Sequence, residues 1–346
     1  MASHHHPVTG VLATVGSTPL VELARLLPGA PFRAFAKLES ANPGGSIKDR
    51  SALEMLRHRL DDGELVPGRS VVVESSSGNL GIGIAQFCGY HGIRFVCVVD
   101  PRTNRQNIAI MRAFGAEVEV VTDVDPGTGE YLPVRIARVR ELVATTPHAY
   151  CPNQYANPLN PRAHHATVRE VLEALPTLDY LFCATSSCGT LRGCAEYIRE
   201  HDLPVTVVAV DALGSNIFGP AVGGRLIPGH GASVRPALHA DGLADEVVRV
   251  DDLGAVVGCR RLAAREAILA GGSSGAVVSA LESMRDRIPA GATCALVLPD
   301  RGERYLDTVY DDDWVAEHFG DVAHLWAPRE RVAAHPGGVL VPAARP

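Results

Sequence analysis

The sequence predicts an α/β protein built on mostly parallel, doubly wound sheets. Short apolar runs rich in β-branched residues alternate with longer helical patterns along most of the chain. Strands that are apolar throughout are typical of parallel sheets buried on both faces, with helices as the connections between strands. The length of 346 residues allows two such units, each with its own hydrophobic core.

The predicted elements follow in order along the chain. The strands are "FRAFAKLE" (32–39), "SVVVES" (70–75), "FVCVVD" (95–100), "EVEVVT" (117–122), "YLFCAT" (180–185), "VTVVAVD" (205–211) and "CALVLPD" (294–300). The helical patterns occupy about 48–61, 80–91, 104–114, 131–144, 161–174 and 190–201. The alternation of the two kinds of segment is what indicates a parallel sheet rather than a β-sandwich.

A change in composition divides the chain near residue 155. The stretch "YCPNQYANPLNPR", rich in Pro and Asn, separates one series of strand–helix units from the next. We therefore expect a larger domain of residues 11–47 plus 155–326 and a smaller, mobile domain of residues 48–154. Residues 327–346 have no hydrophobic period and much Pro and Gly, which predicts a flexible tail.

The composition favours small-molecule chemistry in the cytoplasm. A net charge of −7 provides no basic face for nucleic acid or an anionic membrane. The N-terminus, "MASHHH", lacks the basic and apolar regions of a secretory signal, and no apolar run has membrane-spanning length. The eight cysteines form no Cys-x-x-Cys pair, so we expect reduced core thiols and no metal site.

Three stretches share one design, in which an apolar strand is followed by small residues and then a helix. Their loops are "SSSGNLG" (75–81), "TSSCGTLRG" (185–193) and "GGSSGA" (271–276). Small residues at a helix N-terminus let an anion reach unpaired backbone N–H groups and the positive end of the helix dipole. One such loop is more often a simple connecting turn between a strand and a helix, but three together favour binding of anionic or polar groups.

A lysine at a helix start accompanies these loops. In "ANPGGSIKDR" Lys48 follows a Gly-Gly-Ser turn, and the spacing does not fit a nucleotide-binding P-loop. A solvated lysine is the simpler interpretation, but the helix dipole makes this position unfavourable for a cation. We expect the dipole and Arg50 to favour the neutral, nucleophilic amine, which suits pyridoxal phosphate chemistry.

The motifs "NPGGSIKDR", "SSSGNLG", "SSCGTLRG" and "GGSSGA", in this order, resemble those of the cysteine synthase and cystathionine β-synthase family. These are fold-type II pyridoxal-phosphate enzymes, and the resemblance covers roughly residues 11–310. It implies a fold similar to the tryptophan synthase β subunit, with two doubly wound α/β domains and pyridoxal 5'-phosphate in the cleft. It also implies a transferase that performs β-replacement through an aminoacrylate intermediate.

The resemblance assigns roles to particular residues. Lys48 matches the lysine that forms the Schiff base and moves the substrate's α-proton. Asn79 matches the partner of the cofactor's phenolic oxygen, and Ser273 matches the hydroxyl that faces the pyridine nitrogen, which disfavours transamination. The phosphate loop would consist of Ser186, Ser187, Cys188, Gly189 and Thr190, where the family usually has Gly-Thr-Gly-Gly-Thr. The loop around the substrate carboxylate would consist of Ser76, Ser77 and Gly78.

A narrower resemblance concerns the substrates. The stretches "CVVDP", "NQYANPLN", "VDALGSNIFG" and "LPDRGERYLDTVYDDDW" resemble N-(2-amino-2-carboxyethyl)-L-glutamate synthases of siderophore and 2,3-diaminopropionate biosynthesis. Such enzymes join O-phospho-L-serine to L-glutamate and release phosphate, and the family suggests a homodimer. By this resemblance Arg135 would bind the substrate's phosphate with Tyr155 and Ser186 beside it, and Gln154 would join the carboxylate loop. From spacing alone, Arg135 fits a solvated helix face equally well.

Other interpretations stay open at this point. The aminoacrylate of a cysteine synthase or O-phosphoserine sulfhydrylase would accept sulfide instead of an amine. A non-catalytic ligand-binding or regulatory α/β protein is a second alternative, because a fold does not prove activity. A nicotinamide-dependent dehydrogenase is disfavoured, because "GNLGIG" is not the dinucleotide glycine pattern. We expect His164 and His165 to be ordinary histidines, and Asp300 receives no role.

Overall fold

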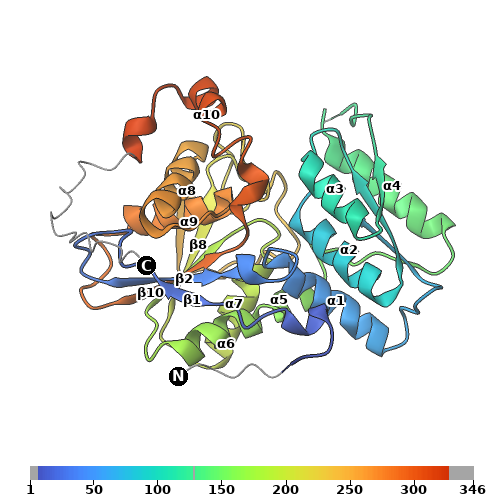
Figure 1. The fold of residues 1–346 in the computed structure, drawn as a ribbon, viewed down its shortest axis with the longest axis horizontal. Helices are drawn as coiled ribbons and strands as arrows, with labels where there is room; N and C mark the ends of the chain where they lie inside the picture. The colour runs from blue at the N-terminus through green and yellow to red at the C-terminus, as the bar shows by residue number, and fades with distance from the viewer. Residues whose placement is uncertain (1–6, 128, 327–346) are drawn as a thin grey trace, which may run out of the picture.

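The computed structural model describes residues 7–127 and 129–326, and its strands form two sheets (Figure 1). The larger sheet has six strands in the order β1-β2-β10-β7-β8-β9. Only β1 runs antiparallel to its neighbour. The strands are β1 (Leu20–Glu22), β2 (Arg33–Leu38), β7 (Tyr180–Ala184), β8 (Thr206–Ala212), β9 (Glu246–Val250) and β10 (Thr293–Leu298).

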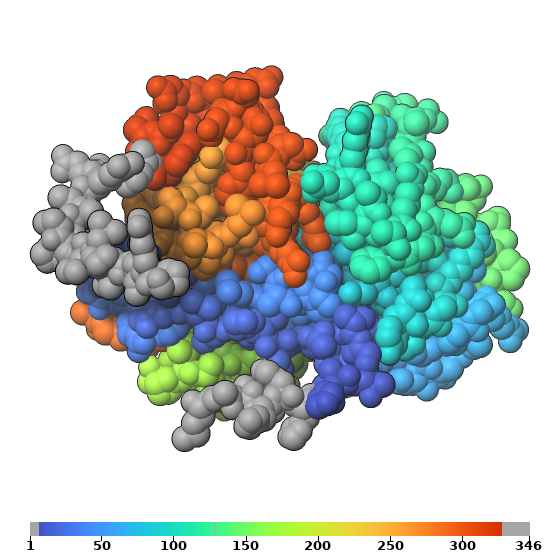
Figure 2. All heavy atoms as spheres, viewed as in Figure 1, coloured from blue at the N-terminus to red at the C-terminus, as the bar shows by residue number. Residues whose placement is uncertain are grey.

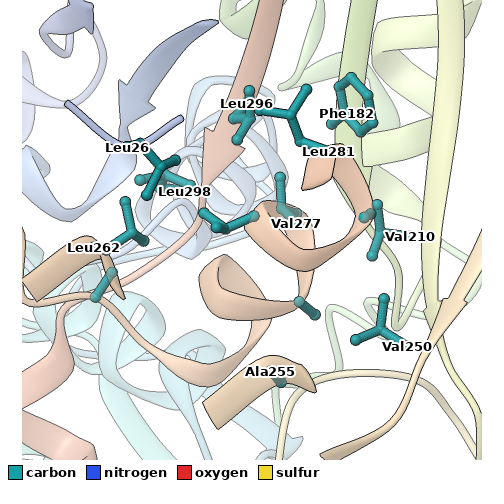
Figure 3. Close-up of a cluster of buried hydrophobic side chains, with 14 of the residues drawn as sticks. Leu26, Phe182, Val210, Val250, Ala255, Leu262, Val277, Leu281, Leu296 and Leu298 are labelled. Carbon is teal, nitrogen blue, oxygen red and sulfur yellow. The ribbon is translucent and has the colours of Figure 1, made fainter. Parts of the chain in front are cut away.

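Helices cover both faces of the larger sheet. The helices α8 (Asp252–Glu266) and α9 (Gly272–Ser283) lie on one face, and α6 (His165–Ala174) and α7 (Gly189–Glu200) lie on the other (Figure 1). Figure 3 shows Val277 and Leu281 of α9 among strand residues such as Phe182 and Leu296, all of them fully buried. The continuous apolar runs of these strands are explained by this burial on two faces.

The smaller sheet has four parallel strands in the order β5-β4-β3-β6. They are β3 (Val71–Ser75), β4 (Arg94–Val99), β5 (Glu117–Val120) and β6 (Ala149–Tyr150). The helices α1 (Lys48–Asp61), α2 (Asn79–His91) and α3 (Arg105–Ala113) share one core with this sheet, and α4 (Tyr131–Thr145) packs on its other face. The two sheets therefore have separate cores.

Short elements complete the chain. They are α5 (Leu159–Arg162), α10 (Asp312–Phe319) and the 3-10 helices η1 (Val11–Thr14), η2 (Glu39–Ala41), η3 (Gly302–Tyr305) and η4 (Ala323–Leu325). No helix among the described residues is long and apolar enough to cross a membrane. The tail predicted for residues 327–346 lies outside the described residues.

The predicted strands and helices agree with the structure to within a few residues, with one exception. The helix predicted for 161–174 is two helices, α5 and α6, because the chain turns at Ala163 and His164. Just before this turn, in α5, the carbonyl of Pro161 lies so close to Gly193 of α7 that a Cβ on Gly193 would be 1.9 Å from it. A tertiary contact of this kind leaves no mark on the hydrophobic period.

A buried ion cluster joins α1 to the larger sheet. The Nε of Arg50 lies 2.7 Å from Oε2 of Glu39, and its Nη1 lies 2.7 Å from Oε1 of Glu170 on α6. The Nζ of Lys37 on β2 lies 2.6 Å from Oε2 of the same Glu170. Burial by itself would raise the pKa of Glu170, but hydrogen bonds from Arg50 and Lys37 lower it to about 2. Its ionisation therefore stabilises the fold above its usual pKa, and this contribution is lost as the pH falls towards 2.

We expect Arg50→Met to lower the free energy of unfolding by roughly 3–5 kcal/mol, because Glu39 would keep a buried charge without its partner. Denaturant titration followed by circular dichroism measures this change. Arg169→Met is the matched control, since Arg169 pairs with Glu173 at 3.7 Å on the exposed face of α6 and its loss should change little. Equal effects of the two substitutions would contradict a structural role for the cluster.

Candidate active site

Four segments that are far apart in the sequence meet between the two sheets. They are the turn before α1, the loop after β3, the loop after β7 and the start of α9. The segment after β10 connects two of them, because Asp300 bridges Ser46 and Arg301 bridges Ala270. Figure 2 shows the surface hollowed between the orange and red C-terminal part and the teal part around α3. Asn79 of the loop after β3 reaches Asp300 in this region, and Ser51 of α1 reaches His164 and Asn160 below the loop after β7.

Lys48 begins α1 with its side chain half-buried. The preceding N–H of Ile47 donates to the carbonyl of Pro299 at 2.8 Å, which fixes the helix start beside the end of β10. Burial lowers the pKa of Lys48 to about 8, although the negative charge of Asp300 acts in the opposite direction. The sequence interpretation attributed this lowering in part to Arg50, which was wrong, because Glu39 and Glu170 neutralise Arg50.

The chain contains only one other lysine, and that lysine is engaged elsewhere. Lys37 is buried, and its Nζ contacts the carbonyl of Thr18 and the carboxylate of Glu170, both at 2.6 Å. The remaining cationic side chains are arginines, which cannot supply a neutral amine. Of the two lysines, Lys48 is therefore the one whose side-chain amine has no hydrogen-bonding partner among the described residues.

The loop after β7 leads into the N-terminus of α7. Cys188 is the N-cap residue and has a left-handed backbone with a φ of +65°. Gly189 packs so tightly that a Cβ would lie 2.5 Å from the side-chain amide of Asn160. The hydroxyl of Ser186 has no hydrogen-bonding partner among the described residues, and Ser187 and Thr190 are buried. The backbone N–H groups at this helix start can bind an anion.

Buried polar side chains form hydrogen bonds beneath the loop after β7. The Nε2 of His164 lies 3.1 Å from the hydroxyl of Ser51 on α1 and 3.3 Å from that of Thr190. Ser51 also donates to Oδ1 of Asn160 at 2.8 Å, and Asn160 donates to the carbonyl of Gln154 at 2.8 Å. Burial lowers the pKa of His164 well below its usual value, so the ring is neutral. His164 is a satisfied core histidine, as the sequence suggested.

The loop after β3 is held by bonds to its own helix and to α3. The hydroxyl of Ser76 accepts the N–H of Gly81 at 2.9 Å, and the carbonyl of Ser77 accepts Nδ2 of Asn107 at 3.0 Å. Gly78 is the N-cap of α2 and Asn79 its first residue. The Nδ2 of Asn79 donates to Oδ2 of Asp300 at 2.8 Å, which links α2 to the end of β10.

The start of α9 contributes hydroxyl groups. Ser273 is buried, and its hydroxyl has no hydrogen-bonding partner among the described residues. The neighbouring Ser274 hydroxyl is also buried and without a described partner. Gly271 allows Asp300 to approach, since a Cβ there would lie 2.0 Å from Oδ1 of Asp300. Sequence interpretation gave Asp300 no role, although its place in "LPDRGERY" after a strand was a signal for a site position.

Arg135 is buried, so the alternative of a solvated helix face is wrong for this residue. Its Nε donates to the hydroxyl of Ser75 at 3.0 Å, and its Nη1 lies 2.8 Å from Oδ2 of Asp100. Burial raises the pKa of the Tyr155 hydroxyl. The positive charge of Arg135 acts in the opposite direction and partly offsets this rise. Gln154, which precedes Tyr155, is buried. Arg135 and Ser186 form no hydrogen bond with each other among the described residues.

Comparison with known proteins identifies the family. A family model described as pyridoxal-phosphate dependent enzyme matches residues 11–300. The chain belongs to this enzyme family. Pyridoxal phosphate is accordingly its cofactor, as the sequence predicted. The dehydrogenase and the non-catalytic interpretation are thereby excluded.

Individual relatives share most of the chain. The N-(2-amino-2-carboxyethyl)-L-glutamate synthase of Ralstonia nicotianae is 45% identical over 338 residues, which are 97% of this chain and 95% of that protein. The protein of the same name from Cupriavidus metallidurans is 46% identical over 311 residues, 88% of this chain and 91% of that protein.

Solved structures confirm the predicted fold-type II α/β class. O-ureido-L-serine synthase has a TM-score of 0.80 at 31% identity and covers 90% of this chain and 100% of that protein. The O-acetylserine-dependent cystathionine β-synthase of Helicobacter pylori has a TM-score of 0.80 at 28% identity and covers 88% of this chain and 99% of that one.

The described residues of this pyridoxal-phosphate-dependent enzyme fit its cofactor. An aldehyde needs an amine with a lowered pKa, which Lys48 provides. A phosphate needs unpaired N–H groups at a helix start, which α7 provides beside the unpartnered Ser186 hydroxyl. A ring nitrogen needs a small polar group, and the hydroxyl groups of Ser273 and Ser274 lack other described partners.

We expect the reaction of Lys48 in cofactor-free protein to follow a midpoint near pH 8, because only the neutral amine attacks an aldehyde. The measurement is the initial rate of pyridoxal phosphate attachment, trapped with borohydride and located by peptide mass spectrometry. Asp300→Asn removes a charge that raises the pKa of Lys48, so the midpoint should move to lower pH. A midpoint near that of a free lysine would contradict the effect of burial.

Proposed function

We propose that the enzyme joins O-phospho-L-serine to the amino group of L-glutamate, giving N-(2-amino-2-carboxyethyl)-L-glutamate and phosphate. The bond from the β-carbon to the phosphate oxygen breaks, a bond to the glutamate nitrogen forms, and the amine loses a proton. The observation that carries this proposal is the 45% identity, over 97% of the chain, to a relative with that name. We place the activity in 2,3-diaminopropionate and siderophore biosynthesis because the sequence resembles synthases of those pathways.

The proposed cofactor site uses residues from four helix starts, those of α1, α2, α7 and α9. Lys48 would bind pyridoxal phosphate covalently, and Ser186, Ser187, Cys188, Gly189 and Thr190 would hold its phosphate. Asn79 would donate to the phenolic oxygen, and Ser273 would face the ring nitrogen. When bound, the cofactor withdraws electrons from the α-carbon of an amino acid, which makes loss of the α-proton and of a β-substituent easier.

Lys48 is proposed to move the α-proton as well. Its pKa of about 8 leaves part of the amine neutral near physiological pH, which suits a general base. Ser273 presents a neutral hydroxyl rather than a carboxylate, so it does not hold the ring nitrogen protonated as an aspartate would. A hydroxyl in place of a carboxylate limits electron withdrawal by the cofactor ring and favours β-replacement over transamination.

The proposed substrate site lies against the loop after β3. Ser76, Ser77 and Gly78 precede α2, where backbone N–H groups can bind the substrate's carboxylate, with Gln154 nearby. Arg135 is the cation proposed for the phosphate of O-phospho-L-serine, with Tyr155 and Ser186 as further contacts. Support for Arg135 comes from its burial and from its effect on Tyr155. A dianionic leaving group needs such a cation, whereas an acetyl ester does not.

Three broader features remain proposals. A smaller domain of residues 48–154 would close over the substrate against residues 11–47 and 155–326, supported by the separate cores of the two sheets. Unchanged small-angle scattering on adding O-phospho-L-serine would contradict closure.

A homodimer is proposed from the family, and light scattering gives the mass that checks it. A cytoplasmic location is supported by the eight free cysteines, and fractionation of cells tests it.

Mass spectrometry of the product tests the proposed reaction. Cofactor-loaded enzyme is incubated with O-phospho-L-serine and with L-glutamate, sulfide or no nucleophile. We expect a glutamate adduct with release of phosphate, and no adduct with Lys48→Ala. Cysteine formed from sulfide, without a glutamate adduct, would instead establish an O-phosphoserine sulfhydrylase.

We expect Arg135→Met to lower kcat/KM for O-phospho-L-serine by about tenfold to a hundredfold relative to O-acetyl-L-serine, because a charge-assisted hydrogen bond to the phosphate is lost. Taking the ratio of the two substrates cancels any change in the folded fraction. Arg138→Met is the matched control, since Arg138 lies on the same helix and pairs with Glu119 and Glu141 at the surface. An unchanged ratio in Arg135→Met would exclude Arg135 as the phosphate contact.

A further inference from the structure

The side-chain amide of Asn79 has two protein partners of opposite kind. Its Nδ2 donates to Oδ2 of Asp300 at 2.8 Å, and its Oδ1 accepts a hydrogen bond from Nη1 of Arg304. Arg304 also donates from Nη2 to the carbonyl of Gly44 at 2.7 Å, in the turn before Lys48. Asn79 therefore lies between the end of β10 and the turn that leads into α1.

These partners leave one orientation of the amide. A guanidinium can only donate, so the oxygen of Asn79 must face Arg304. Oδ2 of Asp300 accepts both Nδ2 of Asn79 and the hydroxyl of Tyr305, each at 2.8 Å. Because Oδ1 of Asp300 has no described partner, a proton on Asp300 would reside there and Oδ2 would still accept. The orientation of Asn79 is thus the same for either charge of Asp300.

The hydrogen-bonding capacity of Asn79 is then nearly exhausted. A carboxamide carries two N–H donors, and Asp300 takes one of them. The second N–H has no partner among the described residues, and the oxygen faces Arg304. The amide can therefore offer a single donor to a ligand, and the complement of a donor is an oxygen with a free lone pair, best of all an ionised one.

We propose that Asp300 and Arg304 are positioning residues that hold Asn79 so that its free N–H favours the ionised form of the cofactor's phenolic oxygen. This inference rests on the proposed contact between Asn79 and the cofactor, but not on the identity of either substrate. Without these two residues the amide of Asn79 can rotate and turn its oxygen towards the cofactor's phenolic oxygen. A carbonyl oxygen is a poor partner for an anion. The segment 300–304 would then act on the electronic state of the cofactor without touching it.

The test uses the absorption spectrum of the holoenzyme without substrate. The ionised form absorbs at longer wavelength than the neutral form, so the ratio of the two bands reports the equilibrium. We expect Arg304→Met to shift this ratio about tenfold towards the neutral form, the effect of losing one charge-assisted hydrogen bond. Arg304→Lys keeps a donor and should restore most of the ratio. Arg301→Met is the matched control, because Arg301 donates to the carbonyl of Ser40 and has no hydrogen bond to Asn79 among the described residues.

A double-mutant cycle separates positioning from a general structural effect. In an Asn79→Ala background, Arg304→Met should cause no further shift, because it acts through Asn79. The same full shift in that background, or a wild-type ratio in folded Arg304→Met, would overturn the proposal.

If Arg304→Met does not fold, Asp300→Ala and Asp300→Asn take its place. The alanine should shift the ratio, and the asparagine, whose carbonyl can still accept from Asn79, should restore it. A glutamate adduct formed normally alongside an unshifted ratio would reject this inference and leave the proposed reaction standing.

Discussion

The buried ion cluster around Arg50 is the interaction on which the geometry of the site depends. The helix α1 belongs to the core of the smaller sheet, yet Arg50 in its first turn is paired with Glu39 and with Glu170 on α6. The larger sheet therefore fixes the start of α1, where Lys48 lies. Each arginine–carboxylate contact is bidentate or nearly so, which adds directional precision to charge neutralisation.

With Arg50 neutralised, the reactivity of Lys48 has a different origin from the one expected. Burial lowers its pKa, while the negative charge of Asp300 limits how far it falls. Asp300 in turn contacts Asn79 and Tyr305, so the same carboxylate influences the amine on one side and the amide on the other. The end of β10 thus links two groups that the sequence separates by about thirty residues along α1, β3 and α2.

The proposed substrate side of the site also contains a buried ion pair. Arg135 is paired with Asp100, which holds the guanidinium in place, and its Nη2 group has no hydrogen-bonding partner among the described residues. A surface arginine would gain little from an ion pair in water, whereas the buried Arg135 is less screened by solvent and partly offsets the raised pKa of Tyr155. The neighbouring arginines Arg138 and Arg140 on α4 do not share this environment, because Arg138 is paired at the surface and Arg140 is exposed.

The sequence by itself determined the α/β class, most strand and helix positions, the cofactor and the loops at the helix starts. These features are local: an apolar run, a helical period or a Gly/Ser turn before a helix carries its own signal. Only the tertiary structure decided that helix 161–174 breaks at His164, that Arg135 is buried, and that Arg50 is neutralised instead of acting on Lys48. It also brought Asp300 and Arg304 to Asn79, more than 200 residues away. The physical reason is that charge and hydrogen bonding depend on which groups meet in space, and neither hydrophobic period nor composition encodes those meetings.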